Sequence, residues 1–212
     1  MNKYDYILLD WDGNLARTLD IWLDACRVSL EKREIHLSDD EIATCFGAFV
    51  ERFTQWGITD IEAMIEEIDK LAKQKLPGVE LYPDALEVLE KLSARSKKLA
   101  LITTSIHENV RHLLDKYDIT HYFDVIIAAD DTEHHKPHPE PLEKALEMLH
   151  GTKDKAVMIG DSDKDLGAAL NAGVDSILFY PPEHKKFYDL ATLSELKPTH
   201  VVDDFRQILE IV

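Results

Sequence analysis

The chain has 212 residues, 45% of them hydrophobic, which is enough for one large domain or for a core that carries a smaller insertion. Its formal net charge of −17 disfavours binding to nucleic acid and to anionic membranes. No apolar run approaches the roughly 20 residues that cross a bilayer, and the N-terminus enters a predicted strand directly, without room for a signal peptide. We therefore expect a cytoplasmic monomer or homodimer with no nucleic-acid or membrane partner, and Cys26 and Cys45 as buried reduced thiols.

The first predicted element is a buried strand at residues 7–9 that ends in Asp10, Asp12 and Gly13. Residues two apart on an extended chain point the same way, so both carboxylates can face one site. Ligands of parallel α/β sheets bind at the carboxyl ends of strands, and paired acids there suit metal binding, covalent attack and proton transfer. The alternative is a solvated strand end followed by an Asp-Gly turn.

Residues 17–75 have apolar positions at helical spacing and no convincing strand. Ser38 followed by three acidic residues indicates a helix start, and Gly47 and Gly57 divide the region into short helices. Pro77 and Gly78 mark its end. We predict an all-α cap domain at residues 16–82, inserted in a core made of residues 1–15 and 83–212.

From Pro83 onward, helices and strands alternate. This alternation predicts a parallel sheet with helices on both faces. The fold class is therefore α/β, with a doubly wound (Rossmann-like) core and the helical cap. The expected strands are 98–103, 125–128, 156–160, 176–179 and a weak one at 201–202; the expected helices are 84–92, 108–116, 139–149, 163–172 and one from 204.

Polar residues follow several of these strands. Thr103 and Thr104 end one strand, Asp161 and Asp165 follow another, and Lys136 lies in a loop between them, before a helix. In a parallel sheet these positions share one edge with Asp10. Carboxylates for a hard cation, together with hydroxyls, amides and an ammonium for an oxyanion, fit a phosphate monoester held against Mg²⁺.

Each of these groups also has an ordinary structural interpretation. Thr103 and Thr104 can cap the next helix, Lys136 can be a solvated loop lysine, and Asp161 and Asp165 can be helix-capping acids. The histidines at 134, 135 and 138 suggest zinc, but no cysteine or carboxylate sits at ligand spacing beside them. The occurrence of all the groups together, in order and at strand ends, favours the phosphate site.

With these motifs, the chain resembles the haloacid dehalogenase superfamily, in its phosphoglycolate phosphatase-like branch with a helical cap. Residues 10–15 (DWDGNL) match the family's Asp-x-Asp-Gly-Thr-Leu motif, and residues 101–104 match its Thr-ending strand. Residues 136–139 (KPHP) match its lysine motif, and residues 160–165 (GDSDKD) match Gly-Asp-x-x-x-Asp. The one departure is Asn14 in place of threonine, which puts a threonine hydrogen bond in doubt.

The resemblance implies an Mg²⁺-dependent phosphatase with a defined division of roles. Asp10 would be the nucleophile that forms an aspartyl-phosphate, and Asp12 the general acid and base. Asp10, the Asp12 carbonyl and Asp161 would hold Mg²⁺, and Asp165 would orient a metal-bound water. By the same resemblance, the Thr103 hydroxyl, the Thr104 amide and Lys136 would bind the phosphoryl oxygens.

Two other functions stay open: a phosphotransferase such as a sugar-phosphate mutase, and a non-catalytic binding module on the same fold. The second is expected to lack a catalytic acid, and none is missing here. The substrate would be a small phosphorylated metabolite that the sequence does not identify. Phe49, Arg52 and Trp56 in the cap are candidates for contact with its leaving group, although the aromatic residues can equally serve cap packing.

Overall fold

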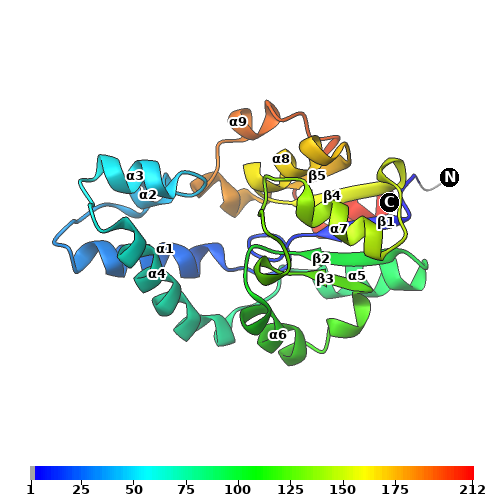
Figure 1. The fold of residues 1–212 in the computed structure, drawn as a ribbon, viewed down its shortest axis with the longest axis horizontal. Coiled ribbons are helices and arrows are strands. Elements are labelled where there is room, and N and C mark those ends of the chain that lie inside the picture. Colours follow the sequence, from blue (N-terminus) through cyan, green and yellow to red (C-terminus); the bar gives the residue numbers. More distant parts are fainter. Residues whose placement is uncertain (1–2) are drawn as a thin grey trace.

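The computed structural model describes residues 3–212, and its centre is a six-stranded parallel sheet (Figure 1). The strand order is β3-β2-β1-β4-β5-β6, so the first strand of the chain lies in the middle. This order places β2 and β4, which carry the polar ends noted above, on either side of β1. The strands are β1 (Tyr6–Leu9), β2 (Lys98–Ile102), β3 (Val125–Ile127), β4 (Ala156–Gly160), β5 (Asp175–Phe179) and β6 (His200–Val202).

Helices cover both faces of the sheet because successive residues of its buried strands point to opposite sides. Ile7 and Leu9 pack in a cluster with α5, α6 and α10, whereas Leu8 packs with α7 and α8. The predicted doubly wound α/β class is confirmed. These helices are α5 (Ala85–Ala94), α6 (His107–Lys116), α7 (Glu140–Met148), α8 (Asp163–Ala172), α9 (Leu190–Ser194) and α10 (Ile208–Ile211).

The segment between β1 and β2 begins with four helices that extend to one side of the sheet (Figure 1). They share a hydrophobic cluster of their own, around Leu23, Phe53 and Met64. The expected helix start at Ser38 is present as a capping box with Glu41. We propose that residues 16–82 form a cap on a core of residues 1–15 and 83–212. Its helices are α1 (Leu19–Glu31), α2 (Asp39–Ala43), α3 (Phe49–Gln55) and α4 (Ile61–Lys75).

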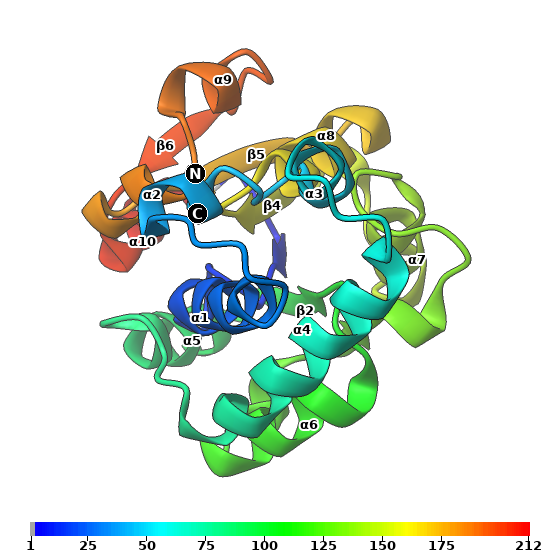
Figure 2. The same ribbon diagram turned by 90° about the vertical axis from the view of Figure 1, so that its left-hand side faces the viewer.

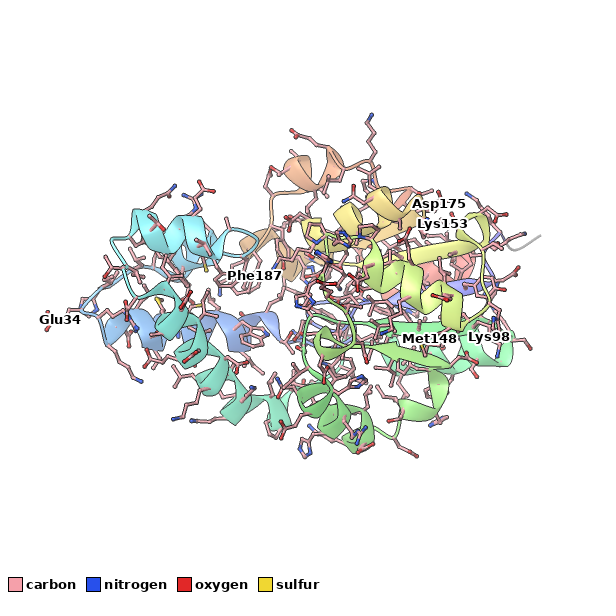
Figure 3. The ribbon with its side chains drawn as sticks, viewed as in Figure 1. Glu34, Lys98, Met148, Lys153, Asp175 and Phe187 are labelled. Carbon is pink, nitrogen blue, oxygen red and sulfur yellow. The ribbon has the colours of Figure 1, made fainter. Side chains whose placement is uncertain are left out.

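A later segment joins this cap cluster. Phe187, which follows the 3-10 helix Pro182–Lys186, packs against Phe46 with ring centroids 4.9 Å apart. Figure 3 shows Phe187 between the cap helices and the sheet. The hydrophobic cluster of the cap therefore includes a residue more than 100 positions beyond its last helix, which the sequence pattern did not indicate.

Most predicted elements lie within two residues of their observed bounds, and the differences occur at the C-terminus. The closing helix is a short 3-10 turn, Phe205–Gln207, followed by α10. Cys26 and Cys45 are both buried and free, as expected. Within residues 3–212, no helix is long and apolar enough to cross a membrane.

Candidate active site

The centre of the site is assembled where β1, β2 and β4 end. Asp10 follows β1 and its amide donates to the Ile159 carbonyl, which keeps the two strands paired up to the edge. Gly13 then turns the chain away with a φ of +75°. A Cβ at Gly13 would lie 2.2 Å from Asp161 Oδ2, so only glycine lets the loop after β1 approach the end of β4 this closely.

Lys136 is buried at this centre and uses all three of its N–H donors. Its ammonium lies 2.5 Å from Asp10 Oδ1, 2.6 Å from Asp165 Oδ1 and 2.9 Å from the Ile102 carbonyl. Burial by itself would lower the pKa of Lys136, but the two carboxylates outweigh it and raise that pKa above its usual value. Lys136 is therefore a permanent buried cation, and its interpretation as a solvated loop lysine is wrong.

The carboxylates around Lys136 are held close enough to repel one another. Burial, with the charge of Asp165, raises the pKa of Asp10 to about 7 against the opposing effect of Lys136. Burial, with Asp165 and Asp10, also raises the pKa of Asp161 well above its ordinary value. One ammonium does not balance three acids at this density of charge, so a further cation would stabilise the cluster.

The donor set fits a hard divalent cation. Asp10, Asp161 and Asp165 each offer an oxygen, and these oxygens lie within 4.8 Å of one another. Asp161 Oδ2 is buried and has no hydrogen-bond partner. Asp165, in contrast, is occupied by Lys136 on one oxygen and by the Ser162 amide and hydroxyl on the other. The free oxygen of Asp161 and the nearby Asp10 are thus the best placed ligands, in all-oxygen surroundings that suit Mg²⁺.

Asp12 is half-buried and makes contacts that the sequence did not suggest. Its Oδ1 accepts a hydrogen bond from the Trp22 indole at 3.3 Å, and its Oδ2 accepts one from the Ser105 hydroxyl at 3.0 Å. Trp22 belongs to α1 of the cap, and Ser105 follows β2. Donors from two elements therefore fix the direction of the Asp12 carboxylate.

The residues that follow β2 differ in their exposure. Thr103 is buried, and its hydroxyl accepts the Ser105 amide at 3.0 Å, which shapes the turn. Thr104 is exposed and lines the cavity described next, together with Ser105. The structure therefore places Thr104, but not Thr103, on the cavity surface, and adds Ser105.

A cavity of about 450 Å³ lies between the sheet edge and the cap helices. Its sheet side carries Asp10, Asp12, Asp161 and Lys136, and Tyr188 lines it from the C-terminal half of the chain. Of the three cap residues expected near a leaving group, Phe49 lines the cavity, whereas Arg52 bonds Gln55 and Trp56 packs on Phe53. The cap side also carries Gly47 and the Asp69–Lys73 ion pair. Its six apolar or aromatic residues, here called the cap wall, are Leu19, Trp22, Phe46, Phe49, Ile65 and Ile68.

Comparison with known proteins identifies the family. The family model described as haloacid dehalogenase-like hydrolase matches residues 7–179. The chain belongs to the haloacid dehalogenase-like hydrolases.

Relatives of this family align over nearly the whole chain. It is 32% identical to pyrophosphatase PpaX of Bacillus thuringiensis over 213 residues, covering 99% of this chain and 97% of that protein. It is 27% identical to pyrophosphatase PpaX of Bacillus mycoides, with 99% and 97% coverage. The crystal structure of a predicted phosphoglycolate phosphatase from Haemophilus somnus 129pt superposes with a TM-score of 0.83 at 24% identity, covering 100% of this chain and 99% of that one, which shows the shared fold.

Asn14, the one departure from the motifs of this hydrolase family, is fully buried beside the site. Its side-chain amide donates to the Asp10 carbonyl at 3.0 Å. Asn14 therefore makes a hydrogen bond that holds the backbone of Asp10, through an amide rather than a hydroxyl.

The histidine-rich loop of this haloacid dehalogenase-like hydrolase lies on the surface beside the site. His134 Nδ1 is 3.0 Å from Glu140 Oε2, and His138 Nδ1 is 4.0 Å from the same oxygen. The expectation that no carboxylate accompanies these histidines is wrong, because Glu140 in the first turn of α7 folds back onto them. Unlike the acidic cluster, this group is largely exposed and already hydrogen-bonded within itself.

Proposed function

We propose that this haloacid dehalogenase-like hydrolase is an Mg²⁺-dependent phosphatase that cleaves a small phosphate monoester through an aspartyl-phosphate on Asp10. The observation that carries the proposal is the buried contact of Lys136 with Asp10 and Asp165, next to the unpartnered oxygen of Asp161. The buried ammonium of Lys136 can bind an anionic phosphoryl group, and the unpartnered Asp161 oxygen can bind the metal ion that such a transfer needs.

In the first step, Asp10 attacks phosphorus, so that an Asp10 oxygen–phosphorus bond forms while the bond from phosphorus to the ester oxygen breaks. Asp12 gives its proton to the ester oxygen, which then departs as the alcohol. The Trp22 and Ser105 donors hold the Asp12 carboxylate in place for this transfer. In the second step, Asp12 takes a proton from the water that attacks the aspartyl-phosphate, and Asp10 and inorganic phosphate are released.

Several groups would stabilise the charge during this transfer. The phosphoryl oxygens would be bound by Lys136, by the Thr104 amide and by the turn that the Thr103 hydroxyl shapes. Asn14 holds the backbone of Asp10 through a hydrogen bond to its carbonyl. Asp10, Asp161 and the Asp12 carbonyl would hold Mg²⁺, which would reduce the repulsion between Asp10 and the phosphate. Asp165 would position Lys136, since their contact is already made.

The partner would be a small phosphorylated metabolite in the cytoplasm, handled by a monomer or homodimer. The net charge of −17 supports a small-molecule substrate over nucleic acid or an anionic membrane. The relatives in Bacillus are named pyrophosphatases, which supports phosphate hydrolysis in general and leaves the kind of phosphate compound to be tested.

Release of inorganic phosphate from an aryl phosphate tests the function. We expect release with Mg²⁺ and none after EDTA treatment, with recovery when Mg²⁺ is restored. A phosphotransferase would pass the phosphoryl group to the hydroxyl of an added sugar phosphate instead of releasing inorganic phosphate, and a binding module would release nothing. Either result would contradict the proposed function.

A further inference from the structure

Two exposed isoleucines line the cavity, one from the proposed cap and one from the core. Ile65 on the cap helix α4 is 42% exposed, and Ile106 at the N-terminal end of α6 is 36% exposed. Figure 2, seen from the side of the cap helices, shows α4 in front of α6, and Lys116 of α6 donates to the Pro77 and Val79 carbonyls just after α4. Large apolar side chains at the wall of a cavity leave surface that a ligand can cover.

The rest of the cap wall has the same character. Its other members are apolar or aromatic, and only Trp22 among them carries a polar atom, which is directed to Asp12. The cavity volume of about 450 Å³ lies within the range of small-molecule sites. It exceeds what a phosphate alone would fill, so room remains for an organic leaving group against this wall.

The charges outside the acidic centre do not form a second anion site. Among the described residues that line the cavity they are Asp69, Lys73, Asp163 and Lys164, and no arginine is present. Lys73 is paired with Asp69 at 2.6 Å on the same helix, and Lys164 adjoins Asp163 in the chain. Two acids and two lysines give no net positive field for a second phosphate or a carboxylate.

We infer that the leaving group of the substrate is a neutral alcohol with an apolar or aromatic body, bound between the cap wall and Ile106. The inference rests on the proposed phosphatase function and adds the substrate class to it. Pyrophosphate and phosphoglycolate would place an anion against this apolar surface, so we expect them to be poor substrates.

The wild-type enzyme is tested first, with Mg²⁺, on benzyl phosphate, phosphoglycolate and pyrophosphate. Benzyl phosphate and phosphoglycolate are both esters of primary alcohols, so they differ mainly in the body of the leaving group. We expect kcat/KM for benzyl phosphate to exceed that for the other two by about tenfold or more, because an apolar contact in a pocket typically changes kcat/KM by at least this factor. A preference for phosphoglycolate or pyrophosphate would overturn the inference while the phosphatase function stands. Failure to hydrolyse any phosphate compound, including an aryl phosphate, would instead overturn the proposed function.

The variants Ile65→Asn and Ile106→Asn then locate the contact. Each should lower kcat/KM for benzyl phosphate about tenfold more than for phosphoglycolate. Val50→Asn is the matched control, because Val50 is a 60% exposed aliphatic residue on the cap helix α3 away from the cavity. It should leave both values unchanged. Equal losses on both esters in the isoleucine variants would mean that these side chains serve closure of the cap, and the inference would be wrong.

Discussion

The two walls of the cavity are built on opposite physical principles. The sheet side brings Asp10, Asp161 and Lys136 together as buried charges that require one another. The cap wall consists of apolar and aromatic side chains, of which Ile65 is 42% exposed. Replacing one buried charge strongly destabilises the protein because its partner is left uncompensated. A volume-conserving substitution among apolar side chains usually costs little. We therefore propose that the sheet side carries the chemistry and that the cap wall selects the substrate.

The largest effect is expected at Asp10 on the sheet side. Asp10→Asn should reduce kcat by about 10⁴-fold or more, because an amide cannot serve as the nucleophile. Steady-state phosphate release, with circular dichroism to verify folding, measures this. Activity within about tenfold of wild type in a folded variant would show that Asp10 does not carry the reaction.

Asp12→Asn should cost less and should depend on the leaving group. With benzyl phosphate we expect a loss of roughly 10² to 10⁴ in kcat/KM, because the departing alkoxide needs a proton. With 4-nitrophenyl phosphate the loss in the first step should be much smaller, since that leaving group departs as a stable anion. Equal losses for the two substrates in pre-steady-state measurements would contradict the role of Asp12 as an acid.

Replacing Lys136 tests the claim that the charges on the sheet side depend on one another. Lys136→Met leaves Asp10 and Asp165 buried without their cation, which should lower the free energy of unfolding by about 3–5 kcal/mol. Lys164→Met, at the edge of the same cavity, is the control and should cost less than about 1 kcal/mol. Urea unfolding without Mg²⁺ measures both, and similar costs for the two variants would refute this dependence.

The pH dependence of the same variant has a definite sign. The pKa of Asp10 is already raised to about 7 with Lys136 present. A carboxyl whose pKa is raised by folding lowers the free energy of unfolding most above its folded-state pKa. This cost is relieved as the pH falls from the folded-state pKa toward the pKa of the unfolded chain, because the carboxyl is then protonated in the folded protein. Loss of Lys136 strengthens this effect, so the stability gap to wild type should be smaller at about pH 5 than at about pH 8. A gap that widens on acidification would contradict the electrostatic account.

The sequence predicted the sheet side far better than the cap wall. Asp10, Asp161 and Lys136 were found because each follows a recognisable strand or precedes a helix, and parallel pairing then brings strand ends together. Trp22 and Tyr188 were missed because their places depend on how the cap and a distant segment fold over the site. Apolar residues in a helical pattern look alike in sequence whether they face a core or a cavity, as Ile65 shows.

Metal binding should produce the smallest measurable change, and it separates the two candidate clusters. Mg²⁺ should raise the melting temperature of wild type by a few degrees, about 2–4 °C for a stabilisation near 1 kcal/mol. Asp161→Asn should remove this shift, and His134→Ala should retain it, since His134 belongs to the exposed group with Glu140. A shift lost only in the histidine variant would move the metal to the surface loop.

The most direct test is to identify the phosphorylated residue. Asp12→Asn is mixed with 4-nitrophenyl phosphate and Mg²⁺, quenched in acid within the first turnover, digested and analysed by mass spectrometry. The account predicts one added phosphoryl group on the peptide that contains Asp10, and none in the double variant that also carries Asp10→Asn. A phosphoryl group on another residue, or turnover in the first variant with no labelled Asp10 at any quench time, would contradict it.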